Sequence, residues 1–147
     1  MKTDPRARYQ GYTFFFKEGF CWSLINGTRS ENDLKFRLSS AGVNDVGGMS
    51  LHSMSSLLPD YYIVCLGNSN LMSRYSETFI NFTVNFQIND ARILPIIVPN
   101  QDELNSFRKV FDKALSMKKL HSEYQDEEEI RRELNQLVDN LYIGKTI

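Results

Sequence analysis

The spacing of the apolar residues changes at about residue 100, and this change limits the folds open to the chain. Beyond it, apolar residues recur every three or four positions in two blocks, Leu104–Leu115 and Ile130–Leu141, as in amphipathic helices. Asn100 with Glu103 predicts a capping box at the start of the first helix, and Gly144 predicts a C-cap after the second. We expect an antiparallel helical hairpin that buries its apolar stripe against the front of the chain or a partner.

The first hundred residues are instead rich in short aromatic and branched runs separated by polar turns, a pattern typical of strands. Strands are expected at residues 12–16 and 20–25, joined as a hairpin, and at 34–38, 49–51, 84–88 and 93–99. Asp60 starts a predicted helix, and a second helix continues through Phe79. The sequence therefore predicts a single α+β domain over residues 1–147. Its β-rich part with a helix pair takes about residues 1–100, and the helical hairpin takes about residues 101–147.

Several catalytic chemistries are excluded by simple spacing. No two of the eight glycines stand as G-x-G, and the two histidines and two cysteines have no metal-ligand spacing, so dinucleotide and zinc sites are not expected. Cys65 lies in the apolar run Tyr62–Leu66 and is expected in the core; a Cys65–His52 nucleophile pair is a weaker alternative. We expect the chain to have no catalytic activity of its own, and no metal.

Charge separates the two ends of the chain. Seventeen basic and eighteen acidic residues give a net charge of −1, which argues against non-specific coating of nucleic acid or membranes. Residues 1–40 hold seven basic and four acidic residues, whereas residues 101–147 hold eight basic and ten acidic residues. The front half therefore has a modest basic bias. No segment is long and apolar enough for a membrane helix, and no signal peptide is seen, so we expect a cytoplasmic protein without membrane contact.

Four segments, taken in order, resemble a known family. Lys17–Ser23 is similar to a "G-[FI]-T-W-S" element. Tyr61–Tyr75, which contains Leu66–Leu71, is similar to an "alLNSkl" helix pair, although Gly67 departs from that pattern. Asn85–Ile96 resembles "n-[FY]-q-[VI]-g-D-i-k-k-[LI]-P-[IV]", and Leu137–Gly144 resembles the closing "iDelVyeLYgl" helix. These elements are typical of the C-terminal target-recognition domain of TaqI-like and type IIG restriction–modification DNA adenine methyltransferases, and of related phage-defence methyltransferases.

The resemblance implies a DNA-reading domain whose partners are double-stranded DNA and a methyltransferase catalytic domain or subunit. In the family, the catalytic domain precedes this one, binds S-adenosylmethionine and carries an [DN]-P-P-[YF] motif. This sequence has no two adjacent prolines, so the motif is absent and no cofactor is expected in this chain. We interpret the chain as a detached recognition domain: a subcloned fragment, a split subunit or a gene remnant.

The expected DNA contacts lie on the polar loop from residue 26 to 33 and on the strand that follows it. Arg29 and Arg37 are the expected base contacts, because a guanidinium can meet both acceptors of guanine, and Asn26 is of the type that pairs with adenine. Lys17 and Lys35 are the expected phosphate contacts. Each of these side chains could equally be solvated surface.

Two other functions stay open. The chain could be an interaction module that docks on another subunit of a phage-defence complex through its helical hairpin, without reading DNA. It could also be a small enzyme with an unrecognised site. Trp22 could stack on an unpaired base, but it shares one face of its strand with Phe20 and Leu24, which favours a core position.

Overall fold

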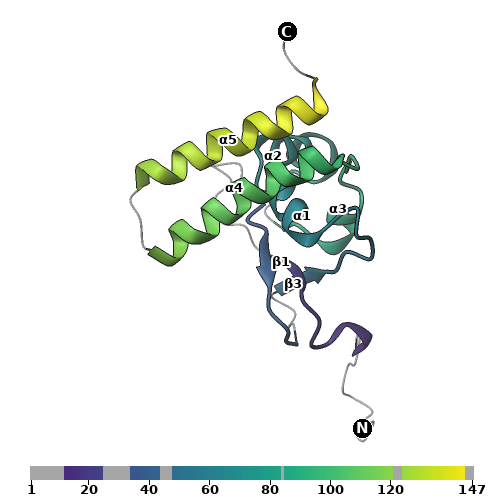
Figure 1. Cartoon of the computed structure of the whole chain (residues 1–147). Helices are drawn as coiled ribbons and strands as arrows, with labels where there is room; N and C mark the ends of the chain where they lie inside the picture. The colour runs from purple at the N-terminus through teal and green to yellow at the C-terminus, as the bar shows by residue number, and fades with distance from the viewer. Residues whose placement is uncertain (1–11, 25–33, 44–47, 84, 121–123, 145–147) are drawn as a thin grey trace, which may run out of the picture.

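The computed structural model describes residues 12–24, 34–43, 48–83, 85–120 and 124–144, and these form an α+β fold (Figure 1). A three-stranded antiparallel sheet has the order β2-β1-β3 and is built from β1 (Gly19–Ser23), β2 (Arg37–Ser39) and β3 (Gly48–Leu51). The short helix α1 packs against both the sheet and the long helix α4, whereas α2 lies against the long helix α5 and α3 lies beside β3. The α+β fold and the C-terminal helix pair predicted from the sequence are confirmed.

The helices follow in chain order. A 3₁₀-helix at Tyr12–Phe14 precedes the sheet, and after it come α1 (Asp60–Gly67), α2 (Asn70–Tyr75), a π-helical turn (Ser76–Ile80), α3 (Ile88–Arg92), α4 (Gln101–Leu120) and α5 (Tyr124–Tyr142). The expected helix pair is therefore α1 and α2, with the second helix continued by the π-helical turn. Ser69 Oγ caps α2 by accepting a bond from the Met72 amide at 3.3 Å, whereas Asp60 instead accepts a bond from the Ser53 amide.

The predicted hairpin between residues 12–16 and 20–25 is wrong. β1 pairs with β2 on one side, where Cys21 opposes Arg37, and with β3 on the other, where Trp22 opposes Met49. Both edges of β1 are therefore occupied, and no ladder position is left for the preceding segment. That segment forms the 3₁₀-helix, and the ring of Phe14 stacks on His52 with the ring centroids 5.2 Å apart.

The strand predictions for residues 34–38 and 49–51 are largely correct. The alternation is confirmed over residues 34–37, because Leu34 and Phe36 are buried whereas Lys35 and Arg37 are exposed, but Leu38, the third apolar residue of the pattern, is also exposed. Only the end of this segment joins the sheet, as β2. The short strand expected at 49–51 is β3.

Neither strand predicted after residue 83 forms as expected: of residues 85–88 only Asn85 makes an isolated β-bridge, and residues 93–99 form no strand. Val84 lies outside the described residues, and Ile88 begins α3 because Asp90 accepts a bond from the Gln87 amide and closes a capping box. Residues 93–99 have no strand partner among the described residues. Tyrosine hydroxyls satisfy their backbone instead: Tyr142 bonds Pro95 O and the Ile97 amide, and Tyr62 donates to Ile97 O at 2.8 Å.

The helical hairpin has the two predicted outer caps, and most of its predicted apolar stripe faces the core; Leu115 was expected in the stripe but is exposed, and Val110 was not expected but is buried. The Asn100–Glu103 capping box is present, with reciprocal bonds of 2.8 and 2.9 Å, and Gly144 has the φ of +90° that a C-cap glycine adopts. The buried residues of the stripe join the main core; they are Leu104, Phe107 and Val110 on α4 and Ile130, Leu134 and Val138 on α5. The hairpin therefore buries its apolar stripe against the front of its own chain.

An aromatic cluster links the sheet to this core. Trp22 is fully buried, its ring stacks on Phe36 with the centroids 4.9 Å apart, and its Nε1 donates to Phe86 O at 2.8 Å. Phe20 stacks on Phe36 on the same face of the sheet. Trp22 is thus a core residue, and it is not accessible to a nucleic-acid base.

Candidate nucleic-acid interface

The two basic residues expected on the 34–38 segment are both exposed. Lys35 and Arg37 reach solvent, whereas Leu34 and Phe36 are buried. The aromatic cluster under Phe36 anchors the segment that carries the two cations.

The backbone of Phe36 is held by the side chain of Asn68, at the junction between α1 and α2. The Phe36 amide donates to Asn68 Oδ1 at 2.8 Å, and Asn68 Nδ2 donates to Phe36 O at 2.7 Å. A carboxamide has one acceptor and one donor group side by side, so it can pair with both backbone groups of one residue. Asn68 therefore substitutes for a neighbouring strand at this residue.

Gly67 explains why the ring of Phe36 can lie so close to α1. A Cβ atom at Gly67 would stand 2.3 Å from Phe36 Cδ2 and 2.6 Å from Phe36 Cγ, well inside van der Waals contact. Gly67, the residue that departs from the "alLNSkl" pattern, thus leaves the space that the Phe36 ring occupies. A larger residue here would displace the ring and the segment attached to it.

Lys35 has an unusual backbone conformation. Its φ is +54°, in the left-handed region that residues other than glycine adopt rarely and at a cost of about 1–3 kcal/mol. The two bonds from Asn68 to the next residue fix the chain immediately after it. Such conformations concentrate where the surrounding structure must hold a side chain in one place.

Arg37 also borders a sheet face made of small side chains. Cα pairing puts Arg37 opposite Cys21, and Cys21 opposite Ser50. Because side chains directly opposite each other share a face, Arg37 stands beside short side chains. β2 is an edge strand, so the guanidinium lies at the border of the sheet.

The remaining expected contacts are not gathered around Arg37. Lys17 is exposed and precedes β1, four residues before the Cys21 that pairs with Arg37, and its Nζ lies 5.3 Å from the centre of the Phe14 ring. Asn26 and Arg29 lie outside the described residues. Of the expected contacts, Lys35 and Arg37 therefore share one segment, and Lys17 lies before the start of β1.

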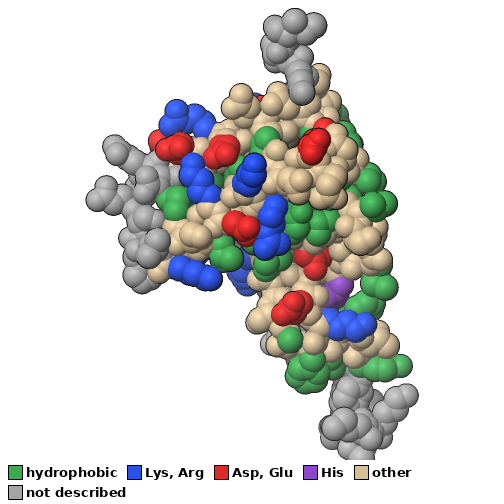
Figure 2. All heavy atoms as spheres, in the orientation of Figure 1, with side chains coloured by type: hydrophobic (Ala, Val, Ile, Leu, Met, Phe, Trp, Pro, Cys, Tyr) green, Lys and Arg blue, Asp and Glu red, His purple; other side chains and the backbone are tan. Residues whose placement is uncertain are grey.

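The distribution of charge differs between the two halves of the surface. Over residues 12–24 and 34–43, three basic residues accompany a single acidic residue, Glu18. On the helical hairpin, cations and carboxylates alternate, as Figure 2 shows, and Lys113 bridges Glu129 and Glu133 at 3.1 and 3.3 Å. The hairpin surface is thus locally neutralised, whereas Lys35 and Arg37 have no carboxylate next to them in the described sequence.

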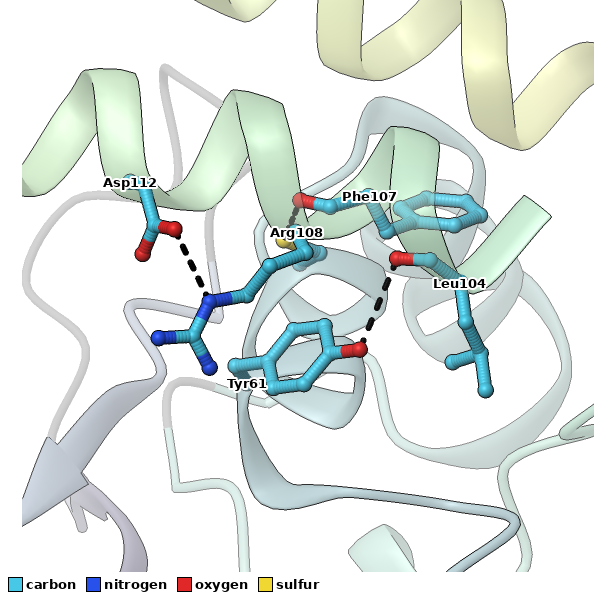
Figure 3. Close-up of polar contacts among 6 residues, drawn as sticks. Tyr61, Leu104, Phe107, Arg108 and Asp112 are labelled. Atoms are coloured by element: carbon cyan, nitrogen blue, oxygen red, sulfur yellow. Dashed lines mark hydrogen bonds and ion pairs between the residues drawn. The ribbon is translucent and has the colours of Figure 1, made fainter. Parts of the chain in front are cut away.

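The polar groups between α1 and α4 are structural. Figure 3 shows the guanidinium of Arg108 over the ring of Tyr61, at 5.0 Å from its centre, while its Nε bonds Asp112 at 2.9 Å. The Tyr61 hydroxyl donates to Leu104 O. These contacts fasten α4 to α1 along one side of the core.

The two groups of the alternative nucleophile pair have separate partners. The thiol of Cys65 faces Phe107 O at 4.0 Å, and burial raises its pKa from 9.0 to about 12, so it stays protonated and a poor nucleophile at neutral pH. His52 Nδ1 is 2.8 Å from Glu18 O. The Cys65 thiol therefore packs in the core against α4, and His52 links its own segment to the residue before β1.

Among the residues that the structure describes, no three His, Cys, Asp or Glu side chains are grouped so that they could hold a metal ion. No helix of the described chain combines the length and apolar character needed to cross a membrane. Comparison with protein-family models, curated proteins and solved structures found no match to this chain.

Proposed function

We propose that this chain recognises a DNA sequence, as the target-recognition domain of a restriction–modification DNA methyltransferase. Catalysis and S-adenosylmethionine binding belong to a separate catalytic domain or subunit. Arg37 contacts a base edge, and Lys35 contacts a phosphate. The observation that carries the proposal is the presentation of these two cations on a segment whose alternate residues, Leu34 and Phe36, are buried and whose backbone is bonded on both sides by Asn68.

The chemistry of the two side chains supports these roles. A guanidinium can bond both O6 and N7 of guanine in the major groove, and such a pair contributes about 1–3 kcal/mol of discrimination. An ammonium is a mobile point charge, suited to the backbone. The Arg37 guanidinium can reach a base edge only if its strand is held in a fixed position relative to the DNA groove. Burial of Phe36, which anchors this strand, therefore matters for readout as well as for stability.

The segments on which the resemblance rests contact one another in this fold. Trp22 of the first segment donates to the backbone of Phe86 in the third. Tyr142 of the closing helix bonds both Pro95 O, at 2.6 Å, and the Ile97 amide. Asn68 of the second segment bonds the strand that carries Arg37. The residues that define the likeness are thus those that join distant parts of this fold.

Selection from a randomised duplex library tests the proposal. The chain, with and without a cognate catalytic subunit, is incubated with the library at two salt concentrations, and bound sequences are counted. Arg37→Ala is expected to relax the preference at one base pair at a cost of about 1–3 kcal/mol. Lys35→Ala is expected to weaken binding to all DNA sequences equally. It is also expected to reduce the slope of the logarithm of the binding constant against the logarithm of salt concentration by about one unit.

Lys113→Ala is the matched control, because this exposed cation belongs to an ion bridge on the helical hairpin. It is expected to change neither sequence preference nor salt slope. If the chain enriches no sequence under any condition, the proposal is wrong. If preference exists but neither Arg37 nor Lys35 affects binding, readout lies on another surface.

Docking on a partner protein is the second candidate, and exposed apolar side chains favour it. They lie between the π-helical turn and α4; the most exposed are Phe79, Phe82, Ile93 and Val98. The stripe of the helical hairpin is already buried within the chain, so a docking surface would use this stretch instead. A library selection without enrichment, together with stable capture of a methyltransferase subunit, would favour docking over DNA readout.

A further inference from the structure

We infer that Asn68 is a positioning residue for base readout: its carboxamide fixes the peptide groups of Phe36 so that Arg37 is held in one orientation toward DNA. The inference rests on the proposed function and deepens it. Asn68 does not touch DNA in this account. It acts through the backbone of the segment that carries the two cations.

The Asn68 side chain bonds both backbone groups of a single residue, Phe36, at 2.8 and 2.7 Å, and the sequence separation is 32 residues. Phe36 precedes the first residue of β2, so the ladder with β1 begins only at Arg37. Without Asn68, the peptide groups before Arg37 would have only water as a partner, and the segment could move as a hinge at that point.

The Lys35 backbone adds a reason for such a restraint. Its φ of +54° puts a non-glycine residue in the left-handed region just before Phe36. Left alone, a non-glycine residue leaves this region, since other conformations are lower in energy. The Asn68 carboxamide and the close contact of the Phe36 ring with Gly67 restrain the segment from two sides.

Two substitutions perturb this restraint by different routes. Asn68→Asp keeps the shape and the acceptor, but it cannot donate to Phe36 O and leaves two oxygens facing each other. Gly67→Ala keeps Asn68 and the charge, but its methyl group would overlap the Phe36 ring. Both are expected to relax preference at the same base pair as Arg37→Ala, with the specific-to-random affinity ratio falling about 5- to 150-fold, the equivalent of one arginine–guanine pair.

Ser69→Ala is the matched control. It lies next to Asn68 and removes the cap of α2, so it also destabilises the domain, but it makes no bond to the 34–37 segment. Ser69→Ala is expected to lower the melting temperature and to keep the wild-type sequence preference. Asn68→Ser, which shortens the side chain without adding charge, serves as a second variant should Asn68→Asp not fold.

Amide hydrogen exchange supplies a readout that needs no DNA. In Asn68→Ser and Gly67→Ala, faster exchange is expected at the Phe36 amide, whereas the Cys21 amide in β1 keeps its protection. The inference is overturned if these variants keep the wild-type base preference while Arg37→Ala loses it; the proposed function then stands. If wild-type protein shows no base preference at all, the proposed function fails and the readout role fails with it, whatever the exchange rates.

Discussion

Replacing Trp22 with phenylalanine tests the structural role of this residue in the aromatic cluster. Trp22 is fully buried and donates to Phe86 O. Phenylalanine has no donor, so the Phe86 carbonyl would lose its partner, at a cost of about 1–3 kcal/mol. The smaller ring also leaves a gap beside Phe36, which costs about 1 kcal/mol. The expected destabilisation is therefore about 2–4 kcal/mol.

Urea denaturation followed by circular dichroism measures this loss. With a slope of about 2 kcal/mol per molar urea, the midpoint should fall by about 1–2 M without a change in slope. Phe82→Leu, at a side chain that is 83% exposed, should stay within about 0.5 kcal/mol of wild type. A midpoint equal to that of wild type would refute the assignment of Trp22 to the core.

Three further predictions concern the helices and the buried thiol. Val138→Asp should abolish the cooperative unfolding transition. Val138 is fully buried on α5, and burying an unpaired carboxylate there costs a free energy comparable with the total free energy of unfolding of the domain. Asn100→Ala should cost about 1 kcal/mol by removing the cap of α4, whereas Asn105→Ala should not. Burial raises the pKa of Cys65 to about 12, so the thiol ionises first in the unfolded chain, and stability should fall between about pH 9 and 12. Cys65→Val should weaken that pH dependence in urea titrations; an unchanged dependence would contradict the assigned burial.

Helix prediction succeeded where local signals decide the structure. The Asn100–Glu103 box and Gly144 lie within a few residues of the groups they cap, so the bounds of the hairpin could be read directly. The apolar spacing of α4 and α5 likewise needs no knowledge of the partner. Burial of Val138 follows from that spacing alone.

Strand prediction failed where pairing depends on distant residues. Phe14–Phe16 has the composition of a strand, but β1 is already paired on both edges, which no local pattern reveals. The 93–99 run was expected to pair with a sheet, yet the hydroxyls of Tyr62 and Tyr142 satisfy its backbone from helices 35 and 45 residues away. Side-chain partners of this kind cannot be inferred from periodicity.

The candidate interface was predicted only in part. Lys35 and Arg37 are polar positions in an alternating segment, so their exposure could be foreseen. Asn68 could not be assigned a role, although it lies in a quoted segment, because its partner is 32 residues away. The left-handed conformation of Lys35 also has no signal in the residue type, since lysine has no preference for it.

The most direct test of the central claim compares Arg37→Lys with wild type on a selected duplex and on its single-base variants. Lysine keeps the positive charge and loses the planar fork that meets two guanine acceptors. We predict that Arg37→Lys loses discrimination at one base pair, by about 1–3 kcal/mol, while its salt dependence stays that of wild type. Discrimination that persists at every base pair in Arg37→Lys would show that this guanidinium does not read DNA.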